Sequence, residues 1–82
     1  MVTLFVANLD YYKVGEDDLR SLFEEYGEVL RVKLPLDWEG KSRGFGFVDM
    51  AREVDALRAL SELDGTEFRG RRLAVKLKQA GT

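Results

Sequence analysis

The chain of 82 residues contains neither cysteine nor histidine. Without cysteine there are no disulfides and no thiolate metal sites, and an intracellular protein is the simpler interpretation. Without histidine the chain lacks the commonest general base and the commonest metal ligand. A hydrolase or a transition-metal enzyme is therefore a poor interpretation, and we expect no catalytic residue, no metal and no cofactor.

Long apolar segments are also missing. No run approaches the roughly 18 residues that a membrane-spanning helix needs, and no basic region precedes the apolar residues 2–6. We therefore expect neither a membrane span nor a signal peptide. Hydrophobic residues still make up 45% of the chain, which is enough for a small domain to fold alone. We expect one monomeric domain over residues 1–80, followed by a tail at residues 81–82.

The formal net charge is only −2, but the charges are unevenly distributed. Residues 1–30 carry seven acidic and two basic side chains, whereas residues 66–82 carry five basic and one acidic. The acids concentrate in two segments with helical periodicity, and the bases concentrate in predicted strands and loops. This distribution predicts a helical face and a sheet face of opposite sign.

Helical periodicity occurs in two segments, residues 16–26 and 52–63. In the first, Leu19, Leu22, Phe23 and Tyr26 recur at the spacing of one helical face. Gly15 is its expected N-cap, and Gly27 is expected to end it in a left-handed conformation.

Strand patterns separate and flank the two predicted helices. They cover residues 3–7, 29–34, 44–50 and 73–77, with an extra short strand at Phe68. The resulting order, β-α-β-β-α-β, predicts an α+β fold of the ferredoxin-like class. In this fold two helices cover one face of a four-stranded antiparallel sheet, and the other face is open.

Alternation along the strands predicts which side chains reach the open face. The apolar residues that alternate with the outward positions along each strand, such as Leu4, Val6 and Val48, are expected to face the helices. Met50 is expected in the core. The outward set combines aromatic and basic side chains with one acid and two alanines: Phe5, Ala7, Arg31, Lys33, Phe45, Phe47, Asp49, Ala74, Lys76 and Lys78. Aromatic rings among cations are typical of surfaces that bind single-stranded nucleic acid.

Two of these strands carry motifs that resemble a known family. Residues 4–9, Leu-Phe-Val-Ala-Asn-Leu, resemble the RNP2 hexamer of RNA-recognition-motif domains, and residues 43–50, Arg-Gly-Phe-Gly-Phe-Val-Asp-Met, resemble their RNP1 octamer. The pattern in residues 56–65 and 68–75 is similar to the family as well, so the resemblance covers nearly the whole chain. Met50 and Gly15 depart from it, where an aromatic residue and a threonine or serine are usual.

The resemblance implies a role for each matching residue. Phe5 and Phe47 match the rings on which successive bases stack, and Phe45 matches the ring that lies against the sugars between them. Arg43 matches the cation that meets a phosphate, and Asn8 is expected to shape the end of the first strand.

Other residues are candidates for contact with RNA. Lys33, Lys76 and Lys78 either contact phosphates or serve solubility and the protection of strand edges. Trp38, in the loop after the second strand, either stacks on a base, anchors a partner protein, or folds back over the sheet edge or Leu36.

Tyr11 and Tyr12 lie in the first loop, where we expect one to pack beneath the loop and the other to approach RNA. The three bases at positions 69, 71 and 72 are expected to form a solvated turn.

The function implied is binding of a short single strand of RNA, with single-stranded DNA as an alternative ligand. A protein-interaction domain is a second interpretation, because some family members bind peptides through an Arg-x-Phe segment. Here the segment is Thr66-Glu67-Phe68, without the arginine. An engineered scaffold with little or no RNA binding is a third. Acylphosphatases share the fold, but the first loop lacks their catalytic arginine and asparagine, so we expect no enzyme.

Overall fold

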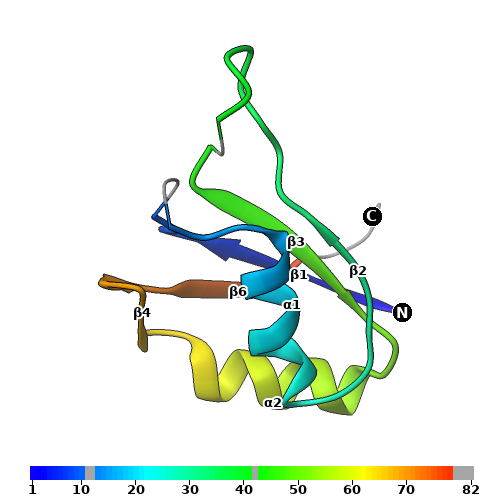
Figure 1. The fold of residues 1–82 in the computed structure, drawn as a ribbon. Helices are drawn as coiled ribbons and strands as arrows, with labels where there is room; N and C mark the ends of the chain where they lie inside the picture. The colour runs from blue at the N-terminus through cyan, green and yellow to red at the C-terminus, as the bar shows by residue number, and fades with distance from the viewer. Residues whose placement is uncertain (11–12, 42, 79–82) are drawn as a thin grey trace.

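The computed structural model describes residues 1–10, 13–41 and 43–78 (Figure 1). Secondary structure follows the predicted order along the chain, with a small hairpin added before the last strand. The elements are β1 (Val2–Ala7), α1 (Glu16–Glu24), β2 (Val29–Lys33), β3 (Phe45–Met50), α2 (Glu53–Leu63), β4 (Glu67–Phe68), β5 (Arg71–Arg72) and β6 (Ala74–Lys78).

The main sheet has four antiparallel strands in the order β2-β3-β1-β6. Helix α1 packs on β2 and β3, and α2 packs on β6, β1 and β3. Both helices lie on the same side of the sheet (Figure 1). The β4–β5 hairpin is separate from this sheet, and it includes Phe68 as expected. The predicted ferredoxin-like arrangement is confirmed.

The core fills the space between the sheet and the two helices. The strands contribute Leu4, Val6, Val48 and Met50, each 0% exposed. The helices contribute further fully buried side chains, namely Leu19, Phe23, Ala56 and Ala59. The inward positions predicted from strand alternation are confirmed, including Met50 in place of the usual aromatic residue.

Gly15 and Gly27 flank α1, and only the first behaves as predicted. Gly15 is the N-cap, and its backbone N–H donates to the Asp18 carboxylate at 2.8 Å. The left-handed conformation predicted for Gly27 is wrong, because it is absent from the positive-φ glycines and α1 already ends at Glu24. Glycine is needed there because a Cβ would collide with the side chain of Asp55 in α2.

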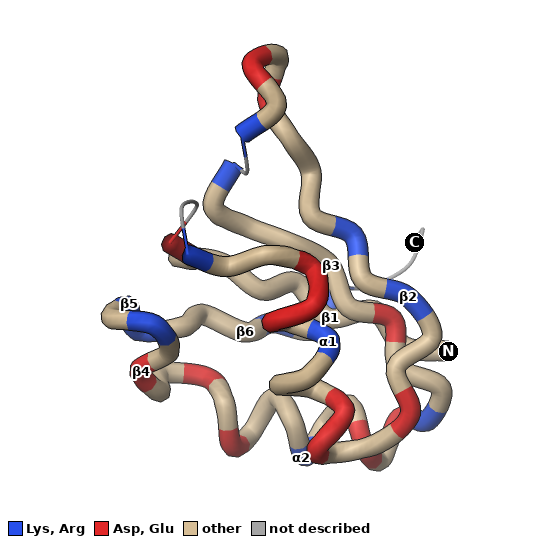
Figure 2. Tube along the Cα trace, viewed as in Figure 1, with Lys and Arg blue, Asp and Glu red and all other residues tan. Residues whose placement is uncertain are grey.

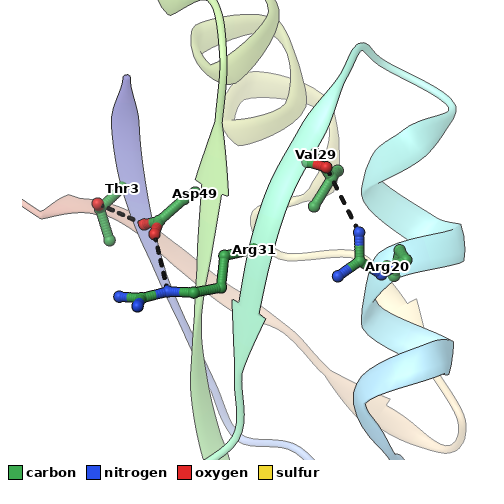
Figure 3. Close-up of polar contacts among 5 residues, drawn as sticks. All are labelled: Thr3, Arg20, Val29, Arg31 and Asp49. Atoms are coloured by element: carbon green, nitrogen blue, oxygen red, sulfur yellow. Dashed lines mark hydrogen bonds and ion pairs between the residues drawn. The ribbon is translucent and has the colours of Figure 1, made fainter.

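An irregularity in β2 determines which of its side chains face the helices. Val29 pairs with Met50, and Arg31 pairs with Asp49, which is adjacent to Met50 in β3. Two steps along β2 therefore match one step along β3, so Leu30 is the extra residue of a β-bulge. Val29 is therefore buried while Arg31 points to the open face. The Val29 carbonyl accepts a hydrogen bond from Arg20 of α1 at 3.4 Å (Figure 3).

Some predicted features fall outside the described residues. These are the roles of Tyr11 and Tyr12 and the end of the domain at residues 79–82. Within the described ranges, no helix combines the length and apolar character needed to cross a membrane.

Candidate nucleic-acid interface

Three phenylalanine rings form a cluster at the centre of the open face. The register between β1 and β3 pairs Phe5 with Phe47 and Ala7 with Phe45. The centroid of Phe5 lies 5.5 Å from that of Phe47 and 5.6 Å from that of Phe45. The rings of Phe45 and Phe47 meet edge to face at 6.0 Å. All three side chains are half-buried, because their edges pack together while their outer sides face solvent.

Basic side chains flank this cluster on both sides. Lys33 of β2 is in register with Phe47, and Lys76 of β6 is in register with Phe5. One row across the sheet is thus lysine, two phenylalanines and lysine, and both lysines are exposed. The predicted outward positions of these cations are confirmed, and their spacing allows a phosphate backbone to pass beside stacked bases.

Two further cations lie over the rings themselves. The Nζ of Lys78 is 4.7 Å from the centroid of Phe47, and the guanidinium carbon of Arg43 is 5.6 Å from the centroid of Phe45. Such cation–π contacts are worth only about 0.5–1 kcal/mol at exposed sites. A base stacking on Phe47 can therefore displace the Lys78 ammonium, which remains close enough to meet a phosphate.

Arg43 is held at the rim of the face by backbone contacts. Its N–H donates to the Pro35 carbonyl at 3.2 Å. The next residue, Gly44, has φ +84°, which favours glycine, and its carbonyl accepts the Leu9 N–H at 2.9 Å. These contacts join the end of β1 to the start of β3, so the two motifs are adjacent in space.

Trp38 lies in the loop between β2 and β3, and this loop projects beyond the sheet (Figure 1). Asp37 builds a tight turn around it, since one carboxylate oxygen accepts the N–H groups of Glu39 at 2.8 Å and Lys41 at 3.0 Å. The indole is 92% exposed. The alternative in which Trp38 folds back over the sheet edge or Leu36 is therefore wrong.

The arginines of the β4–β5 hairpin do more than face solvent. Arg69 forms an ion pair with Asp18 of α1 at 2.9 Å, and Arg71 donates to the Asn8 side chain at 3.2 Å. The Asn8 amide in turn donates to the Arg72 carbonyl at 2.8 Å, and its φ is 64°. All three arginines of the turn are exposed, so the solvated turn predicted here is confirmed, and the partners of Arg69 and Arg71 are an addition to it. The predicted role of Asn8 at the strand end is also confirmed.

The acidic residues concentrate on the helices, as expected. Figure 2 shows acidic residues gathered along α1 and α2 and basic residues along β2 of the main sheet, with further basic residues in β5 of the separate hairpin. Among the outward strand positions named above, Asp49 carries the one carboxylate. It accepts the Thr3 hydroxyl at 2.6 Å, and its other oxygen lies 3.4 Å from Nε of Arg31 (Figure 3).

Sequence reasoning gave these three polar residues no role. Alternation placed Asp49 and Arg31 on the open face, but nothing local indicated that Thr3, 46 residues away, would bond to Asp49. Together they border a recess of about 160 Å³ beside Phe47, lined by Met1, Thr3, Arg31, Lys33, Phe47, Asp49 and Lys78. In the part of the chain described, no cluster of carboxylates suited to a metal ion occurs.

Comparison with known proteins agrees with this geometry. The family model described as RNA recognition motif matches residues 4–74. A relative from Nostoc sp., named "Putative RNA-binding protein RbpD", is 48% identical over 75 residues, which cover 90% of this chain and 79% of the relative.

Solved structures show the same similarity in three dimensions. RNA Binding Protein PG1 superposes with a TM-score of 0.93 at 44% identity, covering 100% of this chain and 99% of the other. A solved Sxl-lethal protein/RNA complex gives a TM-score of 0.89 at 31% identity, covering 98% of this chain and 48% of the other. The chain belongs to the RNA recognition motif family.

Proposed function

We propose that this domain binds a short single strand of RNA on its open sheet face, without catalysing a reaction. The observation that supports it most is the cluster of Phe5, Phe45 and Phe47, whose outer sides are not covered by the helices. Contiguous apolar rings on an uncovered surface, rimmed by polar residues, are typical of an interaction site. The flanking cations favour a ligand that is both planar and anionic.

Each part of the surface has a role in this proposal. Two successive bases stack on Phe5 and Phe47, and each contributes roughly 1–3 kcal/mol. Phe45 packs against the sugars between them. The surrounding cations contact phosphates: Arg43, Lys33, Lys76 and Lys78. Trp38, in the loop between β2 and β3, offers a further ring to nucleotides leaving the sheet.

The expected site is small. A single sheet of this width accommodates two to four nucleotides, so a monomeric domain binds weakly and works inside the cell, where RNA is found. Single-stranded DNA fits the same stacking contacts. Peptide binding in place of RNA has less support, because residue 66 is threonine where the arginine is needed, and its hydroxyl donates to the Leu63 carbonyl at 2.7 Å.

We predict that the domain prefers an unstructured RNA to a duplex. Stacking on Phe5 and Phe47 requires bases whose faces are free, and bases inside a duplex are already stacked. The measurement is fluorescence anisotropy with a labelled hexanucleotide and with a labelled hairpin whose stem contains the same hexanucleotide sequence. Tighter binding of the single strand supports the proposal, and equal affinity for both RNAs contradicts it.

A further inference from the structure

A polar row crosses the open face directly beside the aromatic row. The register places one residue of each strand in it, in the order Arg31, Asp49, Thr3 and Lys78. Phe47 lies two positions from Asp49 along β3, which corresponds to about 7 Å of strand. A base stacked on Phe47 therefore has one edge within reach of this polar row, in the recess of about 160 Å³ that both rows border.

Asp49 is the unusual member of this row, because it is a carboxylate on a surface otherwise suited to anions. It is only 6% exposed, although it faces away from the core. A carboxylate has about four acceptor positions. Thr3 uses one on Oδ1, and Arg31 approaches one on Oδ2. One acceptor position on each oxygen remains for a ligand.

Arg31 lies on the open face because it alternates with the buried Val32, and the register pairs it with Asp49. Its side chain reaches across β3, so that its terminal nitrogens extend past Asp49 toward β1 (Figure 3). The side chain is 72% exposed, and its Nε lies 3.4 Å from the Asp49 carboxylate. The terminal nitrogens remain available as hydrogen-bond donors. The recess thus presents two acceptors of Asp49 next to the donors of Arg31.

We propose that this recess selects guanine at the nucleotide stacked on Phe47, an inference that rests on the proposed RNA binding. The Watson–Crick edge of guanine carries two adjacent donors, N1–H and N2–H, beside one acceptor, O6. The two donors match the two free acceptor positions of the Asp49 carboxylate. The acceptor O6 then faces the Arg31 guanidinium, which is a favoured partner of that atom.

The other bases match fewer of the hydrogen-bond positions in the recess. Cytosine and adenine each bring one amino group beside a ring acceptor, so one of the two remaining acceptor positions of the carboxylate stays unfilled and faces the ring acceptor. Uracil brings a single N–H flanked by two carbonyl oxygens, which the carboxylate repels. A buried acceptor left unsatisfied is costly. Guanine is therefore the base for which donors and acceptors balance.

A purely structural role for Asp49 makes a different prediction. If the carboxylate served only to fasten β1, β2 and β3 together, its replacement would change stability and leave base preference unaltered. The ratio of affinities for different bases is therefore the informative measurement, because uniform effects of charge or stability cancel in it.

The experiment uses four labelled heptanucleotides, each a run of uridines with guanosine, cytidine, adenosine or uridine at the centre. Anisotropy gives the affinity of the parent and of three variants for each. The parent should bind the guanosine oligonucleotide roughly 5- to 150-fold more tightly than the other three, the range expected of one bidentate contact. The change Asp49→Asn keeps an oxygen for Thr3 but replaces the other oxygen with a donor, so the preference should disappear.

The two other variants distinguish a failure of the proposed RNA binding from a failure of the guanine assignment. Phe47→Ala should abolish binding of all four RNAs, and unchanged binding by that variant would contradict the proposed function itself. Arg31→Met alters a side chain that is 72% exposed, so it provides a second test if Asp49→Asn fails to fold. Its guanosine preference should fall. Equal binding of all four RNAs by the parent, a preference for another base, or a preference retained in Asp49→Asn or in Arg31→Met would overturn the guanine assignment while leaving RNA binding intact.

Discussion

The double substitution Phe5→Ala, Phe47→Ala is expected to abolish measurable RNA binding in a domain that stays folded. Two stacking contacts are lost, which amounts to about 2–6 kcal/mol if they act independently. The total binding free energy of a weak RNA binder is little larger than this loss. The measurements are anisotropy with a single-stranded hexanucleotide and thermal unfolding followed by circular dichroism.

The fold should survive because the two rings belong to the surface. They are half-buried through contact with each other and with Phe45, and they do not enter the core cluster beneath the sheet. Their truncation leaves no cavity of the kind that makes loss of a buried phenylalanine cost about 3–5 kcal/mol. Unfolding of the double variant would show that the faces are assigned wrongly. Normal binding by a folded variant would show that RNA binds elsewhere.

The substitution Phe23→Ala is expected to have the opposite profile. Phe23 is 0% exposed and is among the largest fully buried side chains. Its truncation should lower the free energy of unfolding by about 3–5 kcal/mol. Domains are stable by only about 5–15 kcal/mol in total. Urea denaturation should show a large drop in midpoint, while RNA affinity under conditions where the variant is folded should be unchanged.

Phe23→Ala is also the matched control for the face substitutions, since the chemical change is the same and only the location differs. An unchanged urea midpoint for Phe23→Ala would contradict the packing of α1 against the sheet. Loss of RNA binding by a folded Phe23→Ala domain would place the interface partly on the helical side.

The fold and the central site were predictable from the sequence because both follow from short-range patterns. Period-two alternation in β1 and β3 separated Phe5, Phe45 and Phe47 from Leu4, Val6 and Val48, and each set lies where alternation placed it. Helical periodicity likewise identified the buried face of α1. Such patterns depend only on backbone geometry, which is the same wherever the segment sits.

The features that sequence reasoning missed depend on contacts between distant segments. The bulge at Leu30 is defined by pairing with β3, so nothing within residues 29–33 reveals it. The burial of Asp49 arises from Thr3 and Arg31 on two other strands. The sequence predicts that Gly27 ends the helix in a left-handed conformation. Glycine is required there for another reason, because a Cβ would collide with the side chain of Asp55 in α2.

Loop and hairpin residues were the least predictable. Arg69 and Arg71 are exposed as expected, but their partners could not be foreseen, because Asp18 and Asn8 lie 51 and 63 residues away along the chain. The conformation of Trp38 follows from the Asp37 turn, whose hydrogen bonds the sequence alone did not specify. The RNA contacts of the three phenylalanines, of Trp38 and of the flanking cations remain predictions.

Amide mapping by nuclear magnetic resonance shows directly whether RNA lies on the open sheet face. A short single-stranded RNA is titrated into the ¹⁵N-labelled domain, and the chemical shift of each assigned backbone amide is followed. We expect the largest changes at Phe5, Phe45 and Phe47 and their neighbours in β1 and β3, with the Trp38 indole N–H moving if its loop joins the complex. Changes concentrated on α1 and α2, with the sheet amides unmoved, would contradict this expectation.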